Sequence, residues 1–360
     1  MKTSLSSIPS GAYEVIANFM YKDTFEHIEA VMVDNSELFY KVLEVFAVIE
    51  NDSTDISTIC LLTREAYPKV ENVIDVLCNY LIIEKNDTQY SLNEFAEKYI
   101  VGRFMPDAET YNYLSTEIIG RQREVRNALQ QLETDIAERP ALANIMRDWQ
   151  IISDIDSISA ANMYHTYGNV QRECNNSGKW KVECELEEFV NTCYEVERVT
   201  AHPFVKYQKA RILSMVDRSN VLPVKHSDEI RHAYIDCIYA IKTIEQYASI
   251  QQTKSYASLL WLFGHFLYDE KDLPGAIRYL EDSKESFQMQ GITDQEFYQC
   301  VSLLGEVYLD YYLQDRAKNL AYLRRARTES RFLQNNSMNL GKARGYANRL
   351  KSRLTQYGRY

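Results

Sequence analysis

Glycine and proline are scarce in this 360-residue sequence, which contains 12 and 7 of them. An all-β protein needs many turns, and a dinucleotide-binding α/β enzyme needs glycine at its phosphate loop, so neither class is favoured. The prolines are widely spaced and lie near breaks in the helical pattern, where they are tolerated. The composition therefore predicts a protein dominated by helices.

Long apolar runs are also missing. No window approaches the 18 apolar residues of a membrane span, and residues 1–15 contain no apolar stretch long enough for a secretory signal. The seven cysteines are scattered and odd in number, which is typical of reduced thiols. Only Cys174, Cys184 and Cys193 cluster, near His165, and their spacing is too wide for structural zinc. We therefore expect a cytoplasmic protein with no metal and no membrane partner.

Motifs for nucleotide binding and catalysis are absent from the sequence. There is no G-x-x-x-x-G-K-[ST] loop, and residues 177–180, SGKW, lack both the upstream glycine and the hydroxyl residue of such a loop. None of the six histidines lies in a zinc-protease motif, and no G-x-S-x-G is present. We expect no cofactor and no catalytic site; an enzyme with an unrecognised site is the weakest of three hypotheses.

Positive charge is concentrated at one end of the sequence. The net charge is −11, but residues 316–360 hold 12 Lys or Arg and one acidic residue, whereas residues 1–315 carry a net charge of −22. Such a split indicates either a site for nucleic acid, with Arg324, Arg325, Arg327 and Arg331 as its basic patch, or a segment that docks on the acidic remainder or is simply solvated. The second interpretation is favoured.

Residues 36–105 have the pattern of a winged-helix domain, after a lead-in helix within 1–35. Helical periodicity over 36–50 places Leu38, Val42, Val45, Phe46 and Ile49 on one face. A short helix at 56–65 and a third from Pro68 follow, then two short strands, near 81–84 and 88–92, around the turn Asn86-Asp87. The third helix offers Lys69 and Asn72 against Glu71 and Asp75, so we do not expect it to bind DNA.

Residues 106–360 contain only helical pattern and predict a helical-repeat domain. A long helix covers 109–139, and others are expected around 151–175, 179–199, 203–217, 227–249, 254–269, 273–289, 294–313, 316–334 and 338–357. Gly264 precedes Ala276, and Gly305 precedes Ala317, each by twelve residues, and Gly345 lies 40 residues further on. This period of about 41 predicts a superhelix of the tetratricopeptide (TPR) type with lengthened helices. Non-repetitive helical packing is the alternative.

In a TPR-like superhelix the first helix of each pair lines the concave face. The candidate ligand-binding residues on that face are Trp261, His265, Tyr268, Glu306, Leu309, Lys342, Tyr346 and Arg349.

The segments ANFMYKDTFEHI, FYKVLEVFAVIE and NVIDVLCNYLIIEKNDTQYSLNEFAEKYI resemble the winged-helix part of STAND-type signal-transduction NTPases, which include NLR immune receptors and bacterial antiphage sensors. In that family the segment lies between a nucleotide-binding domain and a repeat sensor. The family's Met-His-Asp-like motif, whose histidine senses nucleotide, matches residues 92–94, so that Asn93 replaces the histidine. The resemblance implies an all-α defence or signalling module without its P-loop domain, and an NTPase domain as one of its partners.

The leading hypothesis is a non-catalytic recognition and regulatory module that binds a protein or peptide through its repeat surface. The alternative is a nucleic-acid-binding regulator that uses the basic C-terminal segment.

Overall fold

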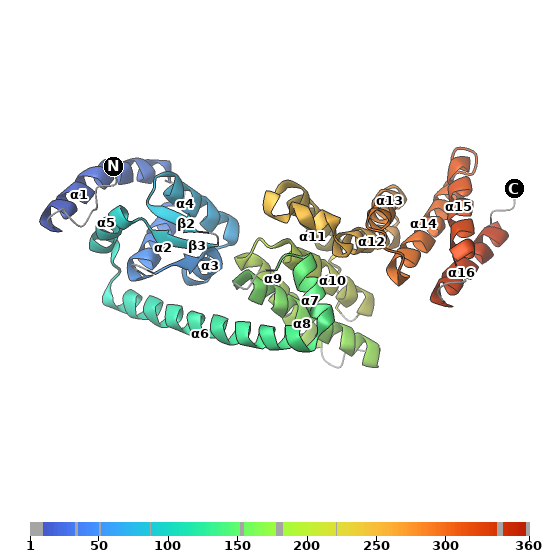
Figure 1. Cartoon of the computed structure of the whole chain (residues 1–360), viewed down its shortest axis with the longest axis horizontal. Coiled ribbons are helices and arrows are strands. Elements are labelled where there is room, and N and C mark those ends of the chain that lie inside the picture. Colours follow the sequence, from blue (N-terminus) through green and yellow to red (C-terminus); the bar gives the residue numbers. More distant parts are fainter. Residues whose placement is uncertain are drawn as a thin grey trace. The chain divides into compact units, whose positions relative to one another are not determined.

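The computed structural model describes residues 10–32, 35–49, 52–86, 88–151, 155–177, 183–220, 222–336 and 341–357. It is of the all-α class, with one small three-stranded sheet (Figure 1). The chain forms two compact units, and each is described by itself. The first contains residues 1–138, 152–165 and 190–205, and the second contains residues 139–151, 166–189 and 206–360. The boundaries at 35 and 105 proposed from the sequence stay predictions.

The first unit combines six helices with the sheet. The helices are α1 (Ser10–Val31), α2 (Ser36–Ile49), α3 (Ile56–Thr63), α4 (Tyr67–Asn79), α5 (Glu94–Phe104) and α6 (Ala108–Glu138). The strands are β1 (Thr54–Asp55), β2 (Ile83–Asn86) and β3 (Gln89–Leu92). Parts of α8 (Ile155–Ser177) and α9 (Glu183–Val199) and the first three residues of α10 (Pro203–Ser219) also belong to this unit.

The hairpin expected from the sequence is present as β2 and β3. They pair antiparallel, with Ile83 opposite Leu92, and β1 adds a third strand by pairing with β3, which gives the order β1-β3-β2. The first strand begins later than expected because Leu81 adopts a left-handed conformation, with φ of 56°, where the chain leaves α4. Such a residue ends a helix and redirects the chain.

Helix α2 packs against α3 and α4 in the core of the first unit. The apolar face predicted for this helix, from Leu38 to Ile49, is buried throughout, and Phe39, Val42 and Phe46 are fully buried. Ile59 of α3 and Ile74 of α4 are fully buried in the same core. This part of the pattern was predictable because one helical face must pack against its neighbours.

The second unit is helical throughout its described residues. It contains α7 (Pro140–Asp148), α11 (Ser227–Thr243), a 3-10 helix (Glu245–Gln252), α12 (Lys254–Asp269), α13 (Leu273–Met289), α14 (Gln295–Gln314), α15 (Leu320–Asn336) and α16 (Gly341–Tyr357), together with the remaining parts of α8, α9 and α10. No helix among the described residues is both long and apolar enough to cross a membrane.

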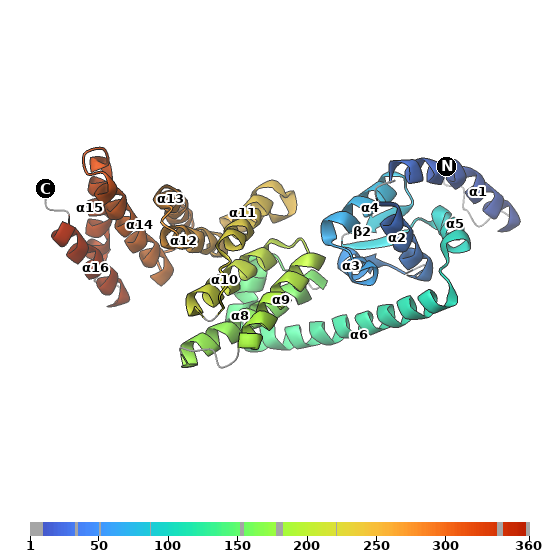
Figure 2. The same cartoon turned by 180° about the vertical axis from the view of Figure 1, so that it is seen from behind.

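Helices α12 to α15 form two helix pairs that follow one another in chain order, and α16 packs on the second pair (Figures 1 and 2). Helix α12 packs on α13, α14 packs on α15, and α14 also contacts α12, α13 and α16. Gly264 allows α12 to approach α13 closely, since a Cβ atom there would lie 2.7 Å from Leu280 Cγ and 3.3 Å from the Leu280 backbone nitrogen. A Cβ atom at Gly305 would clash with Leu350 of α16.

The proposed glycine–alanine spacing holds only in part. Ala276 is buried, but Ala317 is exposed in the turn between α14 and α15. The turn forms because the Asp315 side chain accepts a hydrogen bond from the backbone of Lys318 at 3.2 Å, which delays the start of α15 until Leu320. A Cβ atom at Gly345 would meet no described atom within 4 Å, so no close helix approach requires this glycine.

Candidate functional site

The residues proposed for the ligand-binding face lie on alternate helices of the second unit. Trp261, His265 and Tyr268 are on α12, Glu306 and Leu309 on α14, and Tyr346 and Arg349 on α16. Lys342 lies outside the residues whose side chains the structure describes. Leu309 is fully buried, so its assignment to an open face is wrong. Its side chain lies on the side of α14 that packs in the core.

Three of these residues belong to one continuous network that joins α12, α14 and α16. The Arg349 guanidinium pairs with both carboxylate oxygens of Glu306, at 3.0 and 3.1 Å. Arg353 bridges Glu306, at 3.1 Å, and Asp310, at 2.7 Å. The Tyr268 hydroxyl donates to Asp310 at 2.6 Å. We call these five residues the polar band.

The polar band contains two carboxylates and two guanidinium groups, so its charges cancel. Glu306 is only 3% exposed, and a buried carboxylate is stable when cations and hydrogen-bond donors surround it. Burial, followed by the hydrogen bond to Asp310, raises the pKa of Tyr268 to about 12, so the phenol keeps its proton at neutral pH. The arrangement holds fixed charges and donors in place, which suits recognition better than proton transfer.

Trp261 and His265 lie one to two turns before Tyr268. Their rings stack with centroids 6.4 Å apart, and His265 Nε2 is 3.9 Å from Asp269. Burial lowers the pKa of His265 from its usual value, which favours the neutral ring. The Trp261 indole N–H is buried and has no acceptor among the described residues, although such a donor normally finds one.

Tyr346 is held by glutamine side chains from α14. Its hydroxyl accepts hydrogen bonds from Gln299 at 2.7 Å and, more weakly, from Gln295 at 3.5 Å. This contact joins the start of α14 to α16 and extends the polar connection between these two helices beyond Glu306. Tyr346 therefore lies in the same interface as the polar band, but its hydroxyl is not part of that network.

Sequence reasoning missed Asp310 and Arg353. Each lies four residues after a residue that was named, Glu306 and Arg349, and therefore on the same helical face. That spacing was a usable signal. The spacing could not show that the two acidic residues of α14 pair with the two arginines of α16, which lie 43 to 47 residues further along the sequence.

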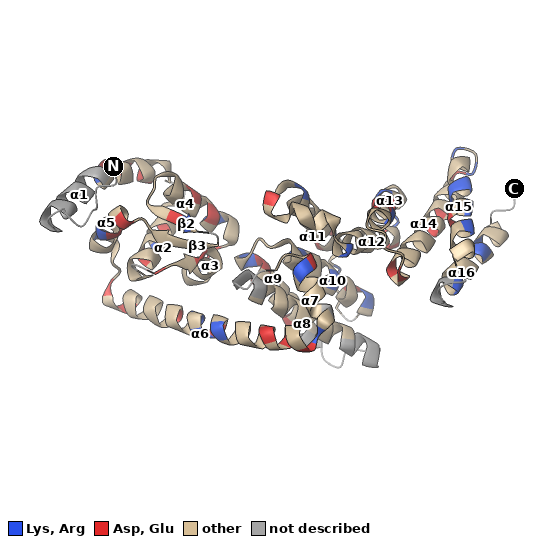
Figure 3. Cartoon of the chain, viewed as in Figure 1, with Lys and Arg blue, Asp and Glu red and all other residues tan. Residues whose placement is uncertain are grey.

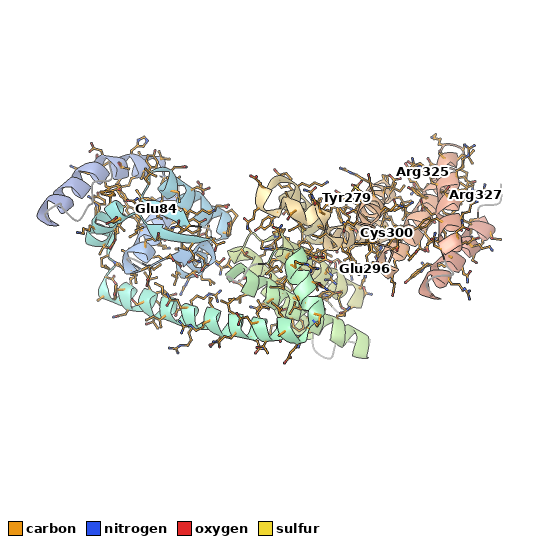
Figure 4. The ribbon with its side chains drawn as sticks, viewed as in Figure 1. Glu84, Tyr279, Glu296, Cys300, Arg325 and Arg327 are labelled. Carbon is orange, nitrogen blue, oxygen red and sulfur yellow. The ribbon has the colours of Figure 1, made fainter. Side chains whose placement is uncertain are left out.

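The basic patch lies on α15, where arginine recurs along the helix (Figure 3). Arg324 and Arg331 are exposed and Arg327 is half-buried. Arg325, shown with Arg327 in Figure 4, pairs with Glu281 of α13 at 2.6 Å and lies over the rings of Tyr308 and Tyr322. Arg325 is thus engaged within the protein.

Asn93 has a local structural role in the first unit. Its side chain accepts a hydrogen bond from the Phe95 backbone at 2.9 Å and so caps the N-terminus of α5. Its amide also donates to Glu84 of β2, a residue marked in Figure 4. Both functional groups of the side chain are therefore occupied, as expected for a good helix cap.

No disulfide joins the described cysteines. Cys60, Cys193, Cys237 and Cys300 are buried, and burial raises the pKa of Cys300 to about 12. The side chains of Cys174 and Cys184 lie outside the described residues. Within the described part of the chain, no group of three or more His, Cys, Asp or Glu is arranged to hold a metal ion.

Comparison with protein-family models, with curated proteins and with solved structures found no match to this chain.

Proposed function

We propose that this protein is a non-catalytic recognition module that binds a protein or peptide through the surface formed by α12, α14 and α16. The observation that carries the proposal is the polar band, in which charged side chains of α14 and α16 and the Tyr268 hydroxyl of α12 are joined along one interface. Arg349 keeps 70% of its side chain exposed while it contacts Glu306, so part of the band is accessible to a ligand. The Trp261 indole N–H is a buried donor without an acceptor among the described residues, so it can serve a ligand carbonyl only if the side chains that cover it move aside.

The packing of α12 to α16 supports a TPR-like superhelix for this region. Each helix pair contacts its neighbours in chain order, as in repeat proteins, where stacking creates an extended binding surface. The close approach at Gly264 is the kind of contact that a small residue in the first helix of a TPR pair provides.

We further propose that residues 36–105 form a winged helix and that the protein is the control and sensor part of a STAND-type signalling system. Three helices, α2 to α4, precede the β2–β3 hairpin, and β1 completes the sheet, which is the element order of that domain. An NTPase domain is then the expected partner. With Asn93 occupied as a helix cap, this position is not expected to sense nucleotide.

The alternative function, nucleic-acid binding by α15 and α16, rests on the exposed Arg324 and Arg331 and on Arg344 and Lys351 of α16. It is the weaker proposal because the Arg325–Glu281 pair removes one cation, and because the net charge of −22 on residues 1–315 repels a polyanion.

Selection of peptides from a displayed random library on the full chain tests the leading proposal. Selected peptides are then titrated by fluorescence polarisation against wild type, Trp261→Phe and Arg349→Gln. Trp261→Phe removes the indole N–H and keeps an aromatic ring, and each variant is expected to weaken binding about tenfold, which corresponds to one lost hydrogen bond or charge contact.

Met289→Gln is the matched control, because Met289 is 77% exposed at the end of α13 and is not part of the face. Its affinity should equal that of wild type. Unchanged binding by both face variants would reject this surface as the ligand site.

A further inference from the structure

Arg211 of α10 is a cation without a carboxylate partner among the described residues. Its guanidinium carbon lies 3.7 Å from the centre of the Tyr167 ring and 5.1 Å from that of Tyr207. Its Nη1 donates to Gln208 Oε1 at 3.1 Å. No Asp or Glu whose side chain is described forms an ion pair with it. The residue is half-buried, and a charge that is removed from water normally has such a partner, because an uncompensated charge is costly to bury.

The surroundings of Arg211 contain a second unsatisfied donor. Gln208 is fully buried, and its Nε2 has no acceptor in the described structure. The amide cannot be flipped to correct this, since Oε1 already accepts from the guanidinium. Arg211 and Gln208 thus carry more hydrogen-bond donors than acceptors, and of the two only Arg211 lines the neighbouring cavity.

A small cavity lies beside Arg211. Its volume is about 60 Å³, and its walls include Tyr167, Ser214, Arg218 and Tyr234. Since one water needs about 10–15 Å³ of such space, the cavity can hold a group of a few heavy atoms but no larger molecule. Arg218 keeps 57% of its side chain exposed and pairs with Asp269, so this wall of the cavity reaches the surface.

We propose that this cavity binds an oxyanion, either a carboxylate or a phosphate group. The ring of Tyr167 covers one face of the guanidinium, and stacking of this kind leaves the N–H groups at the edge for in-plane acceptors. Carboxylate and phosphate oxygens match that fork and are acceptor-only groups. Arg218 also lines the cavity, but its charge is paired with Asp269 at 3.1 Å, so Arg211 is the uncompensated cation of the site. The site uses no member of the polar band, so the proposal is independent of peptide binding there.

Thermal unfolding of the full chain in sodium acetate and in sodium phosphate, at constant ionic strength set with sodium chloride, tests the proposal. Phosphate also stabilises proteins non-specifically, so the informative quantity is the saturable part of the rise in Tm. Wild type should show a saturable rise with at least one anion. Arg211→Gln and Arg211→Met should weaken the apparent affinity tenfold or more.

Two controls keep the experiment decisive. Arg147→Gln removes an arginine that is 76% exposed on α7 of the same unit and should respond as wild type does. Arg211→Met keeps the apolar length without the charge, and in chloride alone it should be as stable as wild type or more so, because a buried unpaired charge has been removed. A response to acetate alone assigns a carboxylate, and a response to phosphate alone assigns a phosphate.

The absence of a saturable rise in wild type with both anions, up to about 100 mM, would overturn the proposal. An equal saturable rise in the two Arg211 variants would overturn it as well. Since the polar band is intact in every one of these variants, peptide binding there can be measured separately on the same proteins.

Discussion

Ion pairs differ in kind between residues 36–105 and helices α12 to α16. In residues 36–105 the described pairs, Lys41–Glu37 and Lys69–Glu65, each lie within four residues of sequence and are largely exposed. In the helical array, Lys284 pairs with Glu329 across 45 residues, and Arg353 pairs with Glu306 across 47. The first region depends on one apolar core, whereas the second also uses charges to join successive helix pairs.

The difference follows from architecture. A domain with one core buries all its elements against the same apolar residues, so surface charges add little. A stack of helix pairs has contacts only between neighbours, and many registers bury similar apolar area. A buried ion pair contributes less to stability than its geometry suggests, but removing one partner is costly, and it can therefore favour a single register.

Substitution of Phe46 should have the largest effect and should act on the first region alone. Phe46→Ala leaves a cavity in the core under α2 and is expected to lower the free energy of unfolding by about 3–5 kcal/mol. Phe46→Leu, which retains most of the apolar volume, should cost less than about 1.5 kcal/mol. Urea denaturation with hydrogen exchange should show lost protection in residues 36–105 while α12 to α16 stay protected. Equal loss in both would mean that the two regions unfold together.

Breaking the Lys284–Glu329 pair should have the next largest effect on the free energy of unfolding. Lys284 Nζ lies 2.7 Å from each carboxylate oxygen, and the side chains are 22% and 7% exposed. Replacing either residue by Met should cost about 2–3 kcal/mol because the other charge is left unpaired, and the double variant should recover most of that loss. Urea denaturation of the four proteins gives the coupling energy. The same cycle on Lys41 and Glu37 should show no measurable coupling; a large value there would contradict the comparison.

Glycine substitutions should separate required from dispensable glycines within the array. Gly264→Ala places a methyl group against Leu280 and its backbone, so we expect a loss of about 1–2 kcal/mol. Gly345→Ala has free space and a better helix former, so a gain of about 0.5–1 kcal/mol is expected. Tm measured by calorimetry should move in opposite directions for the two variants. A shift of the same sign would mean that helix approach at Gly264 does not limit packing.

The smallest expected effect is on nucleic-acid binding. Duplex and single-stranded oligonucleotides should bind negligibly at physiological salt, as measured by fluorescence polarisation. Submicromolar binding that weakens steeply with salt, and that disappears when Arg324, Arg325, Arg327 and Arg331 are all changed to Gln, would place the alternative function first. Changing Arg325 alone should affect stability more than any binding, because it pairs with Glu281.

Local sequence signals predicted much of the helical framework. The ranges 254–269 and 273–289 match α12 and α13, since Thr253 and Asp272 cap these helices and Pro274 lies in the first turn of the second. Breaks without such signals were missed. No helix was predicted for residues 140–150, where α7 lies. The expected helix 227–249 ends at Thr243, and Gln251 of the following 3-10 helix donates a hydrogen bond to the carbonyl of Ile241.

The candidate site was predictable only as a set of positions. Helical spacing identified Tyr268, Glu306 and Arg349, because residues on one face of a helix recur at known intervals. Periodicity does not say which face meets the core, and Leu309 was therefore misplaced. Periodicity also cannot show that a charged side chain has no carboxylate partner. For Arg211 this follows only from its contacts with Tyr167 of α8 and Gln208 of α10 in the folded protein.

Each of the two regions also carries its own buried thiol, Cys60 in α3 and Cys300 in α14. Alkylating reagents react with the thiolate, and at Cys300 burial raises the pKa to about 12, so reaction in the folded state is suppressed. A buried cysteine is then labelled only when its surroundings open. Mass spectrometry of two tryptic peptides after a brief labelling pulse can therefore time the opening of each region within one molecule, without any added probe.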